Sequence, residues 1–248
     1  MEDRTMKAID HFSELRKRII FTLLVFLVSL IVGFVFVQEI YEFLIKDLPF
    51  KLAILGPSDV LIVYLMIATV IAFTLTIPFA AYQTWRFVRP ALTDLERQVT
   101  LAYIPAIFVL FIMGISFGYF VLFPIVLSFL MSLSTEMFTT FYTTEKYFRF
   151  VLHMTLPFGF LFELPVVIMF LTSLGIINPY RLQKIRKYAY FVLIVISVLI
   201  TPPDFLSDIL VIIPLILLYE GSVSLSKIVY KRRMAKTEQD NSEVELVS

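Results

Sequence analysis

The chain has 248 residues, of which 59% are hydrophobic and 17% are charged, and its formal net charge is +1. This composition, with a mean hydropathy of +0.89, excludes a soluble globular domain and indicates a membrane protein with several spans. The absence of cysteine excludes a disulfide framework, a thiolate metal site and a cysteine nucleophile, and two distant histidines, His11 and His153, form no metal-binding pattern.

A charged N-terminal segment precedes the first apolar run. Because Glu2, Asp3 and Asp10 stand among its cations and no small-x-small cleavage site follows, we do not expect a cleavable signal peptide. The uncharged run at 19–37 has about the length that a bilayer core requires, so it is predicted to be the first span.

Three further spans are predicted in the next part of the chain, separated by polar segments. The predicted spans cover residues 60–81, 100–123 and 147–174. Gly114 and Gly118 in the third span are four residues apart, a spacing that favours close contact with a neighbouring helix.

The last two apolar runs, 189–200 and 206–219, are short and are separated by the sequence TPPD at 201–204. Twelve helical residues cover about 18 Å, less than the roughly 30 Å of a hydrocarbon core. One re-entrant hairpin is the alternative, but basic flanks on both sides favour two short spans in a thinned or tilted bilayer. Residues 1–230 are therefore predicted to be one membrane domain, and 231–248 a disordered cytoplasmic tail.

Lysine and arginine are distributed unequally between the two sides of this predicted bundle. Seventeen of the 21 cations fall in the N-terminal segment, the second and fourth loops and the tail, and the other side has only Lys46, Lys51, Lys146 and Arg149. The distribution favours an all-α integral membrane protein with six transmembrane helices and with both termini in the cytoplasm.

Glu163 is an ionisable residue near the middle of the fourth predicted span. Such a group costs a few kcal/mol unless it faces a cavity or a partner, which makes it a candidate functional residue. Two interpretations stay open: a neutral acid that forms a hydrogen bond with a neighbouring helix, or a group coupled to protons or to a substrate.

Glu14 and Glu96 are acids at the predicted cytoplasmic boundary, on adjacent segments. Each has an ordinary explanation, because Glu14 precedes Arg18 by one helical turn and Glu96 lies in a charged loop. Together, however, two carboxylates could each accept a guanidinium group in bidentate geometry, which suits adjacent arginines better than lysines. The sequence contains no phosphate-binding loop, nucleophile elbow or metal-ligand cluster, so we expect neither an enzyme nor a cofactor.

Four motifs, in this order, resemble the TatC family, the multispanning subunit of the twin-arginine protein translocase. They are HFSELRKR at 11–18, FVRPAL at 87–92 followed by Glu96–Arg97, FELP at 162–165 and TPPD at 201–204. The resemblance extends over nearly the whole chain. Phe12 departs conservatively from the leucine of the family pattern, and Asp208 is acidic where a neutral amide is expected.

The resemblance implies a receptor in the inner (cytoplasmic) membrane with a concave, glove-like bundle. Such a receptor binds twin-arginine signal peptides at its cytoplasmic face and exports folded proteins with TatA- and TatB-type single-span partners, using the proton-motive force. The resemblance also implies homo-oligomers within the receptor complex and contact with membrane lipid, but no nucleic acid. A small proton- or ion-coupled transporter that uses Glu163, or a scaffold without a ligand, is the alternative.

Carried over by motif position, the resemblance implies two sites and one buried acid. Glu14 and Glu96 would bind the arginine pair in a site that is also shaped by Leu15, Arg16, Phe87 and Arg97. Glu163 would face the concave side of the bundle. Partner docking would involve Thr201, Pro203 and Asp208.

Overall fold

The computed structural model describes residues 2–46, 48, 50–92, 97, 100–134, 141–201 and 205–247, and within them the fold is all-helical. The elements are α1 (Glu2–Val35), α2 (Val37–Ile45), α3 (Pro57–Val88), the 3₁₀ turn η1 (Arg89–Ala91), α5 (Tyr103–Phe117), the π-helical turn η2 (Gly118–Leu122), α6 (Phe123–Ser134), α7 (Thr144–Leu161), α8 (Leu164–Ser173), α9 (Pro179–Lys184), α10 (Arg186–Ile200) and α11 (Phe205–Val247).

Five helical stretches in the described part of the chain are long and apolar enough to cross a membrane. They are His11–Val35, Pro57–Val88, Tyr103–Ser132, Thr144–Ser173 and Asp208–Ala235. The predicted fifth run lies in α10, which has 15 residues and is therefore short, as expected.

Helix α11 differs from two expectations, because it has 43 residues and continues to Val247. The prediction of a short last helix, ending at 219, was wrong. Glu220 interrupts the apolar run in the sequence, but Arg186 of α10 neutralises its charge and Tyr190 of α10 donates a hydrogen bond to it. Where the composition predicts disorder after residue 230, the helix also continues, through residues such as Met234, Ala235 and Lys236 that favour helix. The division of the chain at residue 230 stays a prediction.

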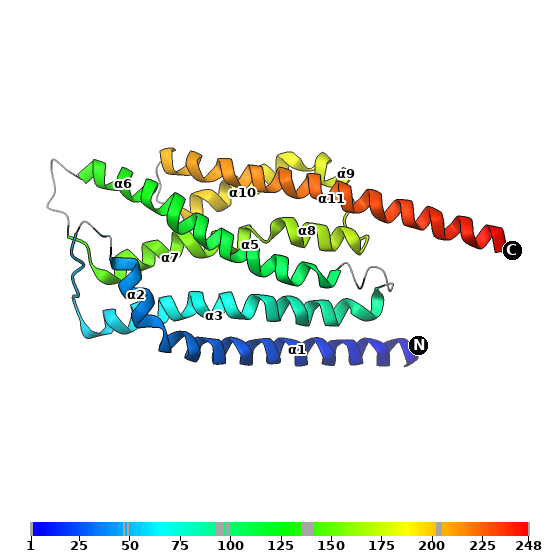
Figure 1. Cartoon of the computed structure of the whole chain (residues 1–248), viewed down its shortest axis with the longest axis horizontal. Helices are drawn as coiled ribbons and strands as arrows, with labels where there is room; N and C mark the ends of the chain where they lie inside the picture. The colour runs from blue at the N-terminus through cyan, green and yellow to red at the C-terminus, as the bar shows by residue number, and fades with distance from the viewer. Residues whose placement is uncertain are drawn as a thin grey trace.

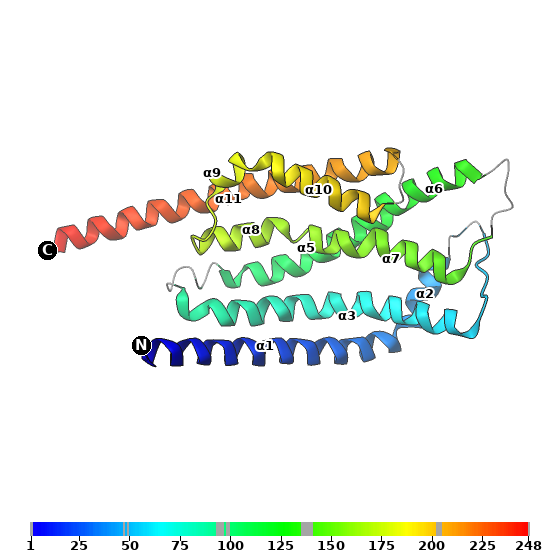
Figure 2. The same cartoon turned by 180° about the vertical axis from the view of Figure 1, so that it is seen from behind.

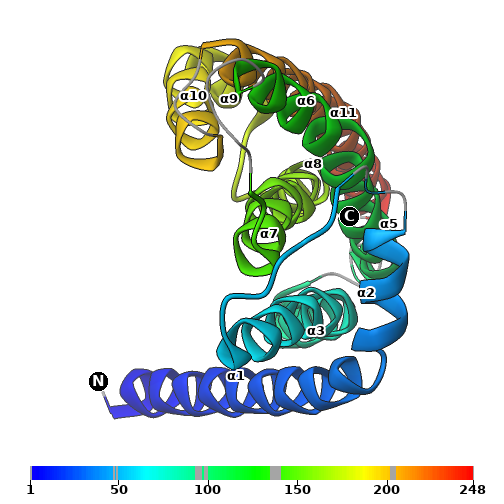
Figure 3. The same ribbon diagram turned by 90° about the vertical axis from the view of Figure 1, so that its left-hand side faces the viewer.

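The helices lie roughly along one axis, and both termini lie at the same end of the molecule (Figure 1). The view from behind shows the same arrangement, with α1 alongside α3 (Figure 2). Seen along the axis, the helices from α1 through α5 and α11 to α10 form a curved row, with α7 on its inner side (Figure 3). Helix α10 ends, and α11 begins, short of the end that α3 and α6 reach (Figure 1).

Helix α1 packs on α3 through small residues. A methyl group on Gly33 would lie 2.9 Å from the carbonyl oxygen of Ala68, and Ser29 and Ala72 are buried. Because lipid gives no hydrophobic drive for helix association, such close backbone approach is a main source of attraction between membrane helices.

Helices α5 and α7 make an even closer contact, and it confirms the prediction from the glycine spacing. A methyl group on Gly114 would lie 2.4 Å from the carbonyl oxygen of Phe158, and one on Gly118 would lie 2.5 Å from that of Met154. The π-helical turn η2 follows at once, so the chain changes its helical phase just after this contact.

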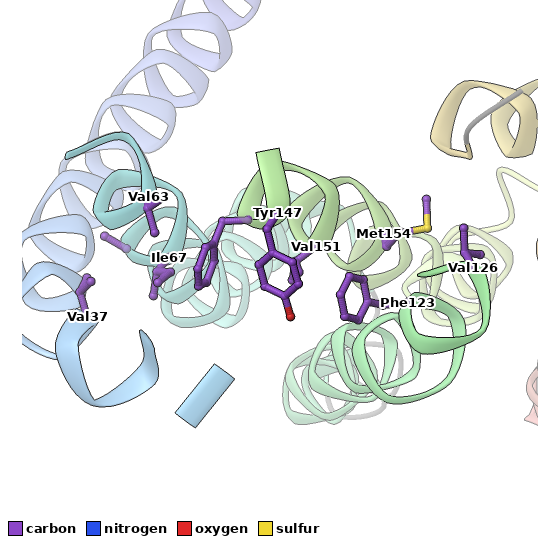
Figure 4. Close-up of a cluster of buried hydrophobic side chains, with 10 residues drawn as sticks. Val37, Val63, Ile67, Phe123, Val126, Tyr147, Val151 and Met154 are labelled. Atoms are coloured by element: carbon purple, nitrogen blue, oxygen red, sulfur yellow. The ribbon is translucent and has the colours of Figure 1, made fainter. Parts of the chain in front are cut away.

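Two clusters of buried side chains join the helices. The first connects α2, α3, α6 and α7, and Figure 4 shows Tyr147 and Phe123 near its centre, between Val37 at one end and Val126 at the other. The second cluster connects η2 and α7 with α10 and α11, and it includes Leu122, Phe158, Leu193, Val211 and Leu215. Helix α7 contributes to both clusters and therefore links the two halves of the bundle.

Two loops are paired at the end opposite the termini. The amide of Thr144 donates to the carbonyl of Ala53 at 2.8 Å, and the amide of Ala53 donates to Tyr142 at 3.0 Å. The ring of Phe50 stacks on Tyr142 with centroids 4.3 Å apart. These contacts fasten the loop before α3 to the start of α7.

The α5–α7 contact can be tested with Gly114→Ala. We expect this variant to lose about 1–3 kcal/mol of folding stability, because the added methyl group meets backbone atoms that cannot move aside. Thermal unfolding of the purified protein in detergent measures the loss. Gly221→Ala is the control, because a methyl group there meets no atom within 4 Å. Equal unfolding midpoints for the two variants would contradict the contact.

Candidate functional site

The predicted binding residues on α1 lie beside the last turns of α3. The ring of His11 stacks on the ring of Phe87, with centroids 4.2 Å apart and an interplanar angle of 23°. Leu15 and Phe87 line the same groove. The structure therefore brings Leu15 and Phe87 to one groove, and Glu14 is bound to Arg18 of the same groove. Arg16 is exposed and does not line the groove.

Glu14 belongs to a short chain of polar side chains that links α1 to α3. The Nε of Arg18 donates to Oε1 of Glu14 at 3.1 Å, and another guanidinium nitrogen donates to Oε1 of Gln83 at 3.0 Å. The Arg18 side chain is 15% exposed and that of Glu14 is 40% exposed. Arg18 is thus held between the helices, and it fixes a carboxylate that stays accessible to a ligand.

This pair confirms the helix support that the spacing of Glu14 and Arg18 predicts. The sequence analysis missed the role of Gln83, which is buried on α3. The sequence does show that Gln83 is an uncharged amide near the end of an apolar run. A polar group buried at such a position needs a hydrogen-bond partner, and this could have indicated its role.

A groove of about 580 Å³ opens between α1 and α3, next to Phe160 of α7. Most of its lining is apolar, including Ile19, Leu23, Phe26, Phe73 and Ile77. Its polar lining includes Arg18, Gln83 and Thr76, and the buried hydroxyl of Thr76 has no hydrogen-bond partner among the described residues. The groove is therefore lined mostly by apolar side chains, with a positive charge from Arg18.

The segment that carries the second predicted acid is anchored on α3. The indole Nε1 of Trp85 donates to the hydroxyl of Thr100 at 3.0 Å, and the Arg89 guanidinium lies 5.6 Å from the Trp85 ring centroid. Arg97 is half-buried in this segment. Glu96 lies outside the described residues, so its position relative to Glu14 stays a prediction.

Glu163 lies at the break between α7 and α8, with Pro165 at the start of α8. The residue is only 9% exposed, and neither carboxylate oxygen has a hydrogen-bond partner in the described part of the chain. The interpretation in which Glu163 forms a hydrogen bond with a neighbouring helix is therefore not what the structure shows. A buried acid without a partner is costly, which makes Glu163 a candidate functional residue.

The residues predicted to dock partners lie at the α10–α11 turn. The hydroxyl of Thr201 is within hydrogen-bonding distance of both the Asp208 carboxylate and the carbonyl of Ser197, and Thr201 is buried. The Ser197 hydroxyl donates to the carbonyl of Asp208 at 3.2 Å. Thr201 and Asp208 therefore bind each other across the turn, and Pro203 lies outside the described residues.

Glu220 on α11 is a charged residue that the sequence analysis did not single out. Its carboxylate accepts from the Arg186 guanidinium at 2.7 Å and from the Tyr190 hydroxyl at 2.6 Å. Arg186 and Tyr190 are one helical turn apart on α10, so both side chains can reach the same partner. This spacing in the sequence could have indicated a shared acidic partner.

Comparisons with known proteins place the chain among translocase subunits. The family model described as "Sec-independent protein translocase protein (TatC)" matches residues 10–214. The chain is 61% identical over 234 residues to Sec-independent protein translocase protein TatCd of Bacillus subtilis, which covers 94% of this chain and 97% of that protein. It is 43% identical over 241 residues to TatC of Halalkalibacterium halodurans, covering 94% and 93%. A crystal structure of the twin-arginine translocase receptor TatC matches with a TM-score of 0.76 and 34% identity, and it covers 88% of this chain and 99% of that one.

The anchor between α3 and the following segment can be tested with Thr100→Val. The variant leaves the buried Trp85 N–H without an acceptor, so we expect a loss of about 1–3 kcal/mol. Thermal unfolding and proteolysis between residues 89 and 100 measure the effect. The control is Thr69→Val, since the Thr69 hydroxyl donates only to its own helix, at Leu65. If Thr100→Val is as stable and as protease-resistant as the control, the anchor is not needed.

Proposed function

Because the chain belongs to the TatC family of Sec-independent protein translocase proteins, we propose that it is the receptor for twin-arginine signal peptides. Membership of this family makes it a multi-pass membrane component of a protein translocase, and not an enzyme. One observation carries the proposal for the binding site: Glu14 is an accessible carboxylate held by Arg18, and Arg18 lines an apolar groove.

The groove fits the two parts of a signal peptide. Such peptides have a positively charged segment followed by 7–15 apolar residues. The guanidinium groups would bind Glu14 and Glu96, while the apolar residues would lie along the groove between α1 and α3. An arginine can engage a carboxylate through two parallel hydrogen bonds, and a lysine cannot, which supports selection of arginine over lysine.

We also propose six spans, with α10 as the short fifth one, and cytoplasmic termini in the inner membrane. The position of both termini at one end of the molecule supports an even number of crossings (Figures 1 and 2). The loops at that end carry most of the cations, as expected of the cytoplasmic side. The curved row of helices in Figure 3 supports a concave bundle.

The proposed partners are TatA- and TatB-type single-span subunits and further copies of this chain. Helix α10 supports such docking because Phe191, Val195 and Leu199, spaced one turn apart, are all exposed. A single apolar helix could pack along this stripe. Thr201 and Asp208 would act indirectly, because they bind each other and set the angle of the α10–α11 turn.

Glu163 is proposed to act in transport and not in the first binding of the peptide. Its buried carboxylate lies at a helix break, where the backbone is already irregular and small rearrangements are possible. The same observation is what a proton- or ion-coupled transporter would require, so the two functions need an experiment that separates them.

The signal-peptide site can be tested by photocrosslinking a twin-arginine peptide to the complete receptor complex. Glu14→Gln and Glu96→Gln should each weaken binding by about 2 kcal/mol or more, roughly 30-fold, because a shielded charge loses its partner. A peptide with two lysines should bind the native chain more weakly. Glu145→Gln is the control, since Glu145 pairs with Arg149 on the start of α7. Unchanged crosslinking in both test variants would refute the site.

The role of Glu163 can be tested with Glu163→Gln, which keeps the shape of the side chain but removes its charge. We expect normal peptide crosslinking and strongly reduced export of a folded reporter protein. Glu39→Gln, at an exposed acid of α2, should reduce neither. Proton flux in liposomes that contain this chain alone, abolished by Glu163→Gln, would favour the transporter function instead.

A further inference from the structure

Two basic stripes that are far apart in the sequence meet at the end of the molecule with the termini. On α9, Arg181 and Lys184 follow Tyr180; on α11, Lys227 and Lys231 flank Tyr230. The rings of Tyr180 and Tyr230 are in edge contact, with centroids 5.9 Å apart, and this contact joins the two stripes. The four cations therefore all lie within four residues, along the sequence, of one of two tyrosines that are in contact.

A hydrogen bond joins α9 to α11, and a helix cap and a neighbouring ion pair support it. The Tyr219 hydroxyl of α11 donates to the carbonyl of Leu182 on α9 at 3.0 Å. The side chain of Asn178 caps the start of α9 by accepting from the Tyr180 amide at 2.9 Å. Immediately beyond α9, Arg186 binds Glu220 of α11. The two stripes are thus held next to each other by the fold.

The sequence on either side of these four cations is poor in acidic residues. The sequence contains neither Asp nor Glu at 174–200 or at 221–237. Glu220, between these ranges along α11, already accepts from Arg186 and Tyr190. In the described part of the chain no carboxylate forms an ion pair with any of the four cations, and bringing like charges together is unfavourable. An anion between the stripes would remove this cost.

The position of the stripes indicates which anion. The apolar part of α10 begins directly after α9, and Tyr180 and Tyr188 are 49% and 62% exposed, as is typical of residues at the level of lipid head groups. Beside the cations, α10 and α11 expose apolar side chains, among them Phe191, Val192 and Ile228. A phosphate with attached acyl chains matches this succession of charge, tyrosine and apolar surface.

We propose that the head group of an anionic phospholipid binds between α9 and α11, with its phosphate among Arg181, Lys184, Lys227 and Lys231. The general excess of cations on the cytoplasmic side explains their number, but it does not require two separate stripes to be packed together. The site is separate from the groove between α1 and α3. Bound lipid would brace the helices that are proposed to receive the single-span partners.

The test measures thermal unfolding of the purified full-length chain in neutral detergent, through the fluorescence of its only tryptophan, Trp85. We expect phosphatidylglycerol to raise the unfolding midpoint by about 5 °C, as a ligand of the folded state does, and phosphatidylcholine to have little effect. The triple variant Arg181→Gln, Lys184→Gln, Lys231→Gln should lose more than half of this rise. All three side chains are exposed, so the variant is expected to fold.

The control is Lys46→Gln, Lys51→Gln, Lys146→Gln, which removes three exposed cations at the opposite end of the molecule. It should keep the full rise. An equal loss of the rise in both triple variants would mean that only net charge matters, and would overturn the proposal. A full rise with phosphatidylcholine, or with inorganic phosphate at the same concentration, would also overturn it.

Discussion

The close approach of α5 to the backbone of α7 is the contact on which the rest of the bundle depends. Gly114 and Gly118 allow it, because any side chain there would collide with α7 carbonyls. In lipid, such contacts replace the hydrophobic drive that holds soluble helices together. Helix α7 contributes to both buried clusters, so this contact also sets the distance between α3 and the pair α10–α11. The groove beside Phe160 and the helix break at Glu163 take their positions from it.

Three charged side chains in the apolar part of the structure fall into two groups, those bound by neighbouring side chains and one that is not. Arg18 is paired twice, with Glu14 and Gln83, and thereby becomes a fixed part of the groove. Glu220 is likewise bound by α10, which lets α11 continue as a helix through a charged position. Glu163 has no partner in the described residues. Two of the three charges are therefore bound by neighbouring helices, and this contrast supports the proposal that Glu163 acts in transport.

The sequence was sufficient for features that depend on local composition or spacing. The first four spans, the short α10 and the glycine contact follow from apolar length and from four-residue spacing. The partners of Arg18 and Glu220 could not be found in this way, because Gln83 is 65 residues from Arg18 and Arg186 is 34 residues from Glu220. The predicted end of α11 was wrong for the same reason. The residues that bind Glu220 are on α10, far from it in the sequence. The signal-peptide site and the docking site that the family resemblance implies stay predictions, because Glu96 and Pro203 lie outside the described residues.

The π-helical turn between α5 and α6 gives the third span two independent orientations. In an α-helix each residue advances the chain by about 100°, so the wider turn at Gly118–Leu122 shifts the angular register of everything that follows. Before the turn, Gly114 faces α7; after it, Phe123 and Val126 face the first buried cluster. The span thus resembles two helices that share one axis, and a deletion within this five-residue joint would turn Phe123 and Val126 away from the first cluster.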